Sequence, residues 1–226
     1  MSATPRPIVR PATPGLWGDT SQRITLAGAQ ALFAAGYLGV GRYVGLPGNV
    51  IGSDVTAAEL AMLTGEGLEV LLFQHVRGNP PAHPLWSPVD HDGAADAAEA
   101  AHRARAAGYP DNAHICQDLE ACDGTAGQVL AYCLRWGRTM VSEVYGAMLY
   151  RGYAVVASDR ELYELPDHNR YASDLGDHQI PVRGTCYVQT KYDVDVGGVV
   201  KVDTAIMRAD LLGDLPMVMA HGEAAA

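Results

Sequence analysis

The sequence predicts an α/β fold, a single-domain (β/α)8 barrel of the TIM type. Its 226 residues are 48% hydrophobic, which is enough for one sizeable core. Short apolar, β-rich runs alternate with longer helical patterns, an order typical of parallel α/β proteins. Polar residues collect where the predicted strands end, and the active sites of such barrels lie at that edge.

An open doubly wound sheet is the alternative that the same alternation allows. A nucleotide-binding sheet of that kind carries a glycine-rich phosphate cradle, but no GxGxxG follows the first strand and no GxxxxGK[ST] occurs. The barrel is therefore favoured, over residues 15–215. We expect residues 1–14, with four prolines, to be a flexible N-terminal segment and residues 216–226 to be a flexible C-terminal tail.

Two elements are well marked in the first half of the chain. Thr56-Ala57-Ala58-Glu59 has the spacing of a capping box and opens a helix that ends near Gly65. Residues 68–76 are almost continuously apolar, as in a strand buried on both faces. The predicted elements are, in order, a strand at 16–19, a helix at 25–36, a strand at 37–44, the helix from Thr56 and the strand at 68–76.

The alternation of helix and strand continues in the second half. An alanine-rich helix at 94–107, closed by Gly108, follows a proline-rich loop. The remaining predicted elements are a strand at 114–120, a helix at about 125–138, a strand at 144–150, a short helix at 159–165, a strand near Tyr171 and a strand at 185–189.

Charge and hydropathy exclude several classes of partner. With 16 basic and 26 acidic residues the formal charge is −10, so we expect no nucleic-acid partner. No run of about 18 apolar residues occurs, so we expect no membrane insertion. Residues 1–7 lack the apolar stretch of a secretory signal, which predicts cytoplasmic synthesis without a signal peptide.

Three carboxylates are the strongest candidates for chemistry. Asp118 and Glu120 are two residues apart on a predicted strand, so they face the same way with Cα atoms about 6.5 to 7 Å apart. Two carboxyls in one buried space can split their pKa values into an acid and a base. Asp19, at the end of the first predicted strand, adds a third acid at the same rim. A solvated strand end or an ion-pair cluster is the alternative explanation.

Other polar residues near strand ends are candidates for binding a substrate. Arg42 also fits a structural ion pair, and Tyr43 and Tyr145 also fit a packed core. The predicted substrate-binding residues are Arg42, Tyr43, Gln74, Tyr145, Gln189 and Asp203.

Metal and serine-hydrolase chemistry are disfavoured. The eight histidines form no HExxH motif, and the densest acidic and histidine group, at 83–92, lies in the proline-rich loop. No GxSxG elbow is present. We therefore expect neither a metal nor another cofactor.

The order of motifs from residue 15 to 210 resembles the glycoside-hydrolase-like barrel domains related to the family 25 lysozymes of bacteria and phage. No single motif is specific, but their order and spacing together carry the resemblance. The matching segments are Trp17-Gly18-Asp19-Thr20, residues 35–43, Thr56 to Glu59, Gly67-Leu68-Glu69-Val70, Asp118-Leu119-Glu120, Val144-Tyr145-Gly146, Gln189 and Val202-Asp203.

The resemblance implies a glycosidase mechanism. Glu120 would protonate the glycosidic oxygen, and Asp118 and Asp19 would stabilise an oxocarbenium-like state or hold the N-acetyl group of the substrate. The implied partner is a bacterial cell-wall glycan or a related polysaccharide, cleaved in a lysozyme-like or muramidase-like reaction.

Departures from the family pattern keep a second hypothesis open. Gly18 stands where a Phe is usual, and Tyr187-Val188-Gln189 replaces a Trp-Gln pair. The alternative is a non-catalytic glycan-binding or structural component of a phage-like or injection-type secretion assembly. A wall-cleaving protein made without a signal peptide would leave by lysis or through a delivery machine, whereas a bound component need not leave at all.

Overall fold

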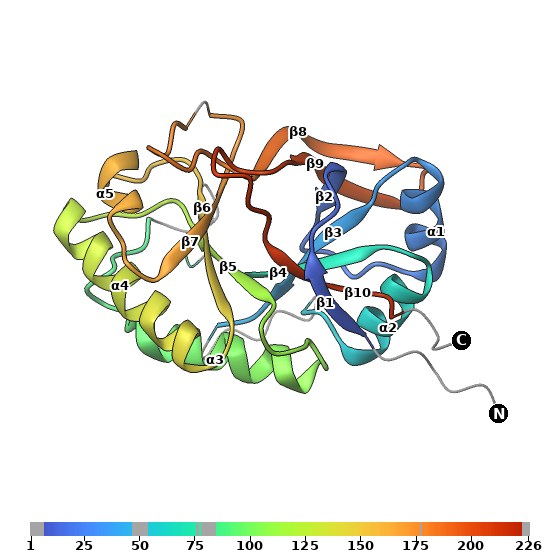
Figure 1. Ribbon diagram of the computed structural model, residues 1–226, viewed down its shortest axis with the longest axis horizontal. Coiled ribbons are helices and arrows are strands. Elements are labelled where there is room, and N and C mark those ends of the chain that lie inside the picture. The colour runs from blue at the N-terminus through green and yellow to red at the C-terminus, as the bar shows by residue number, and fades with distance from the viewer. Residues whose placement is uncertain (1–6, 47–53, 76, 78–84, 177, 223–226) are drawn as a thin grey trace.

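The computed structural model describes residues 7–46, 54–75, 77, 85–176 and 178–222. Helices and strands alternate along most of this chain (Figure 1). The strands are β1 (Ile8–Pro11), β2 (Gly15–Asp19), β3 (Gly39–Val44), β4 (Glu69–Gln74), β5 (His114–Leu119), β6 (Gly146–Arg151), β7 (His168–Ser173), β8 (Tyr187–Val196), β9 (Val200–Met207) and β10 (Met217–Ala220). The helices are α1 (Leu26–Ala34), α2 (Ala57–Gly65), α3 (Gly93–Ala106), α4 (Ala126–Ser142) and α5 (Asp159–Tyr163).

Eight of the strands, β2 to β9, form a closed barrel, so the predicted TIM-type fold is confirmed. The sheet order places β4, β3, β2, β9, β8, β7, β6 and β5 side by side, and pairing of β4 with β5 closes the ring. Neighbouring strands run parallel from β2 to β8. The carboxyl ends of these strands therefore meet at one mouth of the barrel.

The strand β9 departs from a regular (β/α)8 barrel. It is antiparallel to both of its neighbours, β8 and β2, and it follows β8 through a tight hairpin. Gly197 and Gly198 both have positive φ, +65° and +71°, a conformation that glycine adopts without steric cost. The Gly-Gly pair thus allows the chain to reverse where a regular barrel would insert a helix.

Each of the first two helices begins at a threonine cap. The Thr25 side chain accepts from Gly28 N, and the Thr56 side chain accepts from Glu59 N. The expected capping box at Thr56 is only half formed, because the Glu59 carboxylate turns inward and accepts from Ile24 N and Arg42 Nε, at 2.9 and 2.8 Å. Glu59 therefore fastens α2 to β3 instead of capping its own helix.

Two short strands, β1 and β10, lie near the two ends of the described chain, within the segments 1–14 and 216–226. β1 and β10 pair antiparallel, and β10 pairs with the start of β4, at the amino end of the barrel. Buried Glu69 holds β1 in place by accepting from Arg10 Nε at 2.9 Å and from Thr13 N at 2.8 Å. Pro11 is tolerated because β1 lies at the edge of the sheet.

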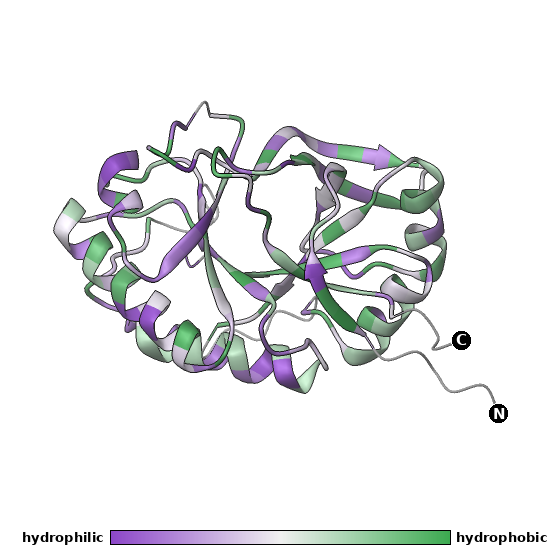
Figure 2. Cartoon of the chain, in the orientation of Figure 1, coloured by the Kyte–Doolittle hydropathy of each residue, from purple (hydrophilic) through white to green (hydrophobic). Residues whose placement is uncertain are grey.

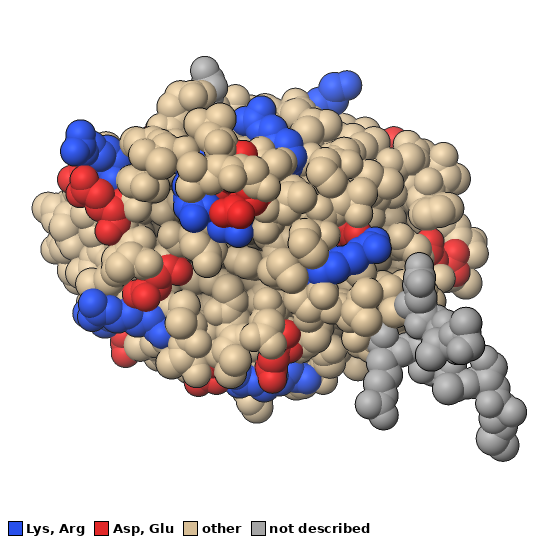
Figure 3. All heavy atoms as spheres, in the orientation of Figure 1, with Lys and Arg blue, Asp and Glu red and all other residues tan. Residues whose placement is uncertain are grey.

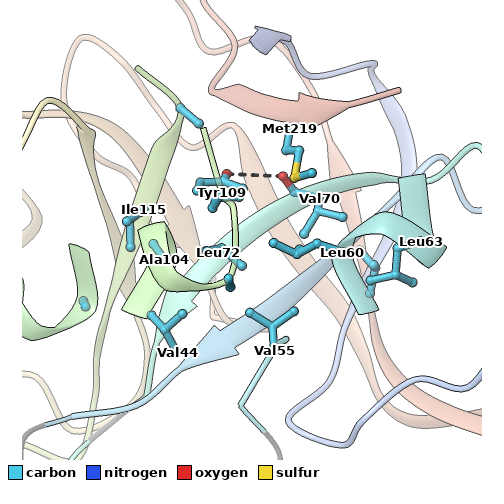
Figure 4. Packing of buried hydrophobic residues seen from close by; sticks show 14 of the residues in the cluster. Val44, Val55, Leu60, Leu63, Val70, Leu72, Ala104, Tyr109, Ile115 and Met219 are labelled. Carbon is cyan, nitrogen blue, oxygen red and sulfur yellow. Dashed lines mark hydrogen bonds between the residues drawn. The ribbon is translucent and has the colours of Figure 1, made fainter. Parts of the chain in front are cut away.

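Apolar side chains fill two layers, one inside the barrel and one between the strands and the helices. Hydrophobic residues are found along both strands and helices (Figure 2). The outer layer includes Leu60, Val70, Leu72 and Ile115, which pack around Tyr109 (Figure 4). The inner layer consists of residues such as Trp17, Leu71, Phe73, Cys116, Met148 and Tyr187. Because strand residues alternate between faces, this division fixes which polar side chains can reach the mouth.

Candidate active site

Polar side chains that continue the inner layer toward the carboxyl ends of the strands form the mouth of the barrel. Leu71 and Phe73 point inward on β4, and by the same alternation Asp19 follows Trp17 on β2 and Asp118 follows Cys116 on β5. The mouth residues of the eight barrel strands and the chain just after them are Asp19, Tyr43, Asp118, Glu120, Tyr150, Asp174, Tyr187, Gln189 and Asp203.

Asp19 is buried between two tyrosines. Tyr43 OH donates to its Oδ1 at 3.0 Å, and Tyr187 OH donates to its Oδ2 at 2.8 Å. Burial raises the pKa of Asp19 to about 7, and nearby Asp203 adds to the rise, while the two hydrogen bonds oppose it. Gly41 makes this arrangement possible, because a Cβ at that position would lie 2.8 Å from the Cβ of Asp19.

Asp118 and Glu120 share one side of the mouth. Asp118 is 8% exposed, and its Oδ1 is buried without a hydrogen-bond partner among the described residues. Burial raises the pKa of Asp118 well above its ordinary value, and the charges of Glu120 and Asp19 raise it further. Burial likewise raises the pKa of Glu120 to about 7, with Asp174 as the next cause. Glu120 is therefore able to carry a proton near neutral pH.

A hydrogen-bonded chain crosses the mouth from β6 to β9. Tyr150 OH donates to Gln189 Oε1 at 2.8 Å, and Gln189 Nε2 donates to Asp203 Oδ2 at 2.9 Å. Asp203 also accepts from the backbone of Asp193 at 2.7 Å, and burial raises its pKa. These contacts fix the side chains of Gln189 and Asp203 toward the same opening as Asp19.

A cavity of about 180 Å³ opens beside Asp19. Its volume is below the roughly 300 to 1,000 Å³ of pockets that hold a drug-sized molecule, so it suits a single small group of a larger ligand. The lining residues are Asp19, Thr20, Ser21, Gln22, Tyr43, Asp193, Lys201, Val202 and Asp203.

Three of the predicted substrate-binding residues, Arg42, Gln74 and Tyr145, lie away from the mouth. Arg42 is fully buried on the outer face of β3, where it donates to Glu59 and to the carbonyl oxygen of Thr20. Gln74 also points outward from its strand and accepts from Trp136 Nε1 on α4. Alternation along the strands places both side chains against the helices.

Tyr145 lies away from the mouth for a different reason. It precedes β6, so it lies at the amino end of the strand, opposite the mouth. Its OH donates to the carbonyl oxygen of Tyr109 at 3.1 Å, and its ring is buried. Of the six predicted residues, the structure brings Tyr43, Gln189 and Asp203 to the mouth.

The sequence reasoning missed three residues of the mouth. Tyr150 and Tyr187 alternate with outward-facing neighbours on their strands. Once the acids of β5 are known to point inward, the same alternation predicts that these tyrosines point inward too. Asp174 follows β7, a strand whose bounds the sequence left uncertain. Its carboxylate is nearly buried.

Charges elsewhere are mixed. On the face shown in Figure 3, Lys and Arg side chains lie beside Asp and Glu rather than in one basic area. Among the described residues, no group of three or more His, Cys, Asp or Glu is arranged to hold a metal ion. Within the same part of the chain, no helix is long and apolar enough to cross a membrane.

Comparison with known proteins finds a family and several similar structures. Residues 30–206 match the model of the Rv2525c-like, glycoside hydrolase-like domain. No curated protein matches the sequence.

The similar structures share the fold at low sequence identity. The Tat-secreted protein Rv2525c of Mycobacterium tuberculosis is 19% identical with a TM-score of 0.62, covering 88% of this chain and 100% of its own. A bacterial lysozyme from Streptomyces coelicolor is 12% identical with a TM-score of 0.60, covering 86% and 92%. The modular autolysin LytC of Streptococcus pneumoniae, in complex with a synthetic peptidoglycan ligand, is 12% identical with a TM-score of 0.58, covering 84% of this chain and 46% of its own.

Proposed function

The chain belongs to the family of Rv2525c-like, glycoside hydrolase-like domains, and from this premise we propose that it hydrolyses a bacterial cell-wall glycan. One observation carries the proposal. Glu120, with a pKa raised to about 7, stands beside the buried carboxyl of Asp118 at the mouth of the barrel. Most glycosidases use such a pair, in which one carboxylic acid keeps its proton near neutral pH and a second carboxyl lies beside it.

Glu120 is the general acid of the proposed reaction. It donates its proton to the glycosidic oxygen as the bond to the leaving sugar breaks. Asp118 Oδ1, which has no partner among the described residues, accepts a hydrogen bond from an N–H or O–H of the bound sugar. An N-acetyl group held there is placed to attack internally, and the carboxylate form of Asp118 stabilises the oxocarbenium-like state.

Asp19 and its neighbours bind the sugar beside the scissile bond. Tyr43 and Tyr187 hold Asp19 in one orientation, and Gln189 and Asp203 hold each other. A rigid set of donors and acceptors fixes the hydroxyl groups of a pyranose with little loss of side-chain entropy. The relation to the family 25 lysozymes, and with it a muramidase-like linkage specificity, belongs to this proposal.

The proposed substrate lies outside the cytoplasm, so the protein has to be exported or released. The similar Mycobacterium tuberculosis protein is Tat-secreted, which supports export. Release by lysis or through a delivery machine is the other route.

A charge-neutral substitution tests the role of Glu120. Glu120→Gln keeps the shape of the side chain but has no proton to give, so it should lower hydrolysis by about 100-fold or more. Release of reducing sugar from purified peptidoglycan, measured for wild type and variant near pH 6, gives the ratio. Glu164→Gln, an exposed change on the outside of the barrel, is the matched control and should leave the rate unchanged. Equal rates for wild type and Glu120→Gln would remove Glu120 from the mechanism.

A second candidate function is glycan binding without cleavage, as a component of a phage-like or injection-type assembly. The observation that favours it is that the pKa values of Asp19, Asp118, Glu120 and Asp203 are all raised. A mouth in which burial favours the neutral form of these carboxyls can bind sugar hydroxyls by hydrogen bonds without assisting cleavage. Sedimentation of the protein with peptidoglycan, without release of reducing sugar, is the result that this candidate predicts.

A further inference from the structure

Glu120, Gly152 and Asp174 lie at one level on three neighbouring strands. The register pairs Asp118 with Tyr150 and Tyr150 with Ala172. The ladder continues past the strand ends, because Gly152 N donates to Leu119 O at 3.0 Å and Asp174 N donates to Arg151 O at 3.3 Å. Two residues beyond Asp118, Tyr150 and Ala172, the chain therefore brings Glu120, Gly152 and Asp174 into one row.

Gly152 leaves a gap in the middle of this row. A Cβ at that position would lie in hard contact with Glu120 Oε2 and 2.6 Å from Glu120 Cβ. The φ angle of Gly152 is outside the range that favours glycine, so space and not backbone strain explains the residue. The Glu120 side chain thus lies over Gly152, on the side of the mouth where Asp174 is found.

A chain of charged and polar groups contacts the Asp174 carboxylate. Its Oδ1 accepts from Gly176 N at 2.7 Å and lies 3.1 Å from His178 Nε2. The ring of His178 contacts Arg151 Nη1, and Arg151 Nε lies 2.9 Å from Asp159 Oδ1. Gly176 N and the His178 ring therefore fix the position of the Asp174 carboxyl.

We propose that Asp174 is a positioning residue for Glu120, facing it across the gap at Gly152 and keeping the proton on Glu120 through the negative charge that Gly176 and His178 hold in place. Glu120 and Asp174 are then a pair of carboxyls that interact across the gap at Gly152. The meaning of this pair for catalysis rests on the proposed function, whereas the electrostatic coupling itself does not.

Groups from every surrounding strand face Glu120, and their effects have to be separated. After burial, Asp174 is the largest cause that raises the pKa of Glu120, followed by Asp19 and Asp203. The charge of Glu120 in turn raises the pKa of Asp118, at the end of β5. The phenols around the acid, which remain neutral at physiological pH, are Tyr150, Tyr153 and Tyr192.

The test is a direct titration of the Glu120 carboxyl by carbon-detected NMR of the full chain. In Asp174→Asn the pKa of Glu120 should fall by about 1 unit, because the facing charge is gone while the acceptor for Gly176 N remains. Glu164→Gln removes one negative charge on the outside of the protein and should leave the pKa of Glu120 unchanged. An unchanged pKa in Asp174→Asn overturns the proposal.

A measurement on the wild type covers the case in which Asp174→Asn does not fold. The Asp174 carboxyl carbon should show a second inflection at the pH where Glu120 titrates, since the two groups interact. Its absence overturns the proposal without any variant.

Activity separates this proposal from the proposed function. If peptidoglycan is hydrolysed, the alkaline limb of the rate profile should move to lower pH by the same amount in Asp174→Asn. A fall in the pKa of Glu120 with no hydrolysis by the wild type supports the coupling and refutes the glycosidase. Hydrolysis with an unchanged pKa of Glu120 supports the glycosidase and refutes the coupling.

Discussion

Asp19 is a carboxyl kept inside the protein at a cost that depends on pH. Its pKa is raised to about 7 in the folded protein, whereas an unfolded aspartate titrates at about 3.9. Both states hold the proton below about pH 4, so the group has no effect there. As the pH rises toward 7 the unfolded state ionises first, and stability is lost. The buried acid therefore destabilises the fold at neutral pH.

Replacing Asp19 by Asn should remove this cost. We expect Asp19→Asn to raise the free energy of unfolding on the order of 2 to 4 kcal/mol near neutral pH, with the gain vanishing below about pH 4. The amide keeps an acceptor for one tyrosine hydroxyl and offers a donor to the other. Urea unfolding of both proteins at a series of pH values measures the difference.

Two buried histidines change the stability of the fold in the opposite direction over the same pH range. Burial lowers the pKa of His114 to about 4 and of His168 to about 3, so stability falls as the pH drops below about 6.5. Because wild type and variant share these histidines, their difference isolates Asp19. Asp193→Asn, an exposed change on the β8–β9 hairpin, serves as the control. A variant no more stable than wild type near neutral pH would contradict the argument.

Element by element, alternation along the strands decides which predicted site residues reach the mouth. The Asp-x-Glu pattern at the end of β5 could be read correctly, since residues two apart share a face whichever face it is. Gln74 could not be placed, because residues 69–74 are buried on both faces and give no polar alternation to follow. The Gly-Gly pair at 197–198 was the available signal for the antiparallel β9.

Arg42 belongs to the contact between α2 and β3, and a substitution there should act on stability. Arg42→Met leaves buried Glu59 without its cationic partner, so the free energy of unfolding should fall by about 3 to 5 kcal/mol. Thr56→Ala, which removes only the helix cap, should cost about 1 kcal/mol. Denaturant unfolding compares the two. If Arg42→Met lost affinity for glycan without losing stability, Arg42 would instead have a role in substrate binding.

At the scale of the whole molecule, the fold class could be predicted from the sequence. The pairing of β1 with β10 at the amino end of the barrel could not. The alternation of strands and helices predicts the barrel, whereas β1 and β10 are four-residue strands that no periodic pattern reveals. Long-range pairing of the two ends holds them in place, with Glu69 of β4 as the anchor. Such pairing is a tertiary effect that local sequence does not encode.

The anchor of β1 gives a prediction about the integrity of the barrel end. Arg10→Ala removes the hydrogen bonds that Arg10 donates to buried Glu69 and should destabilise the protein by about 2 kcal/mol. Arg160→Ala, which breaks only an exposed pair with Glu164, should change stability by less than about 0.5 kcal/mol. Thermal unfolding distinguishes the two, and equal effects would show that β1 contributes no anchor.

The most direct test of the central claim is the identity of the bonds that the wild-type protein breaks. Purified peptidoglycan is incubated with the protein between about pH 4 and 8, reduced with borohydride and examined by mass spectrometry. We predict new reducing ends on N-acetylmuramic acid, absent when Glu120→Gln is used. No new reducing end at any pH in this range would contradict the glycosidase and leave a barrel that binds glycan without cleaving it.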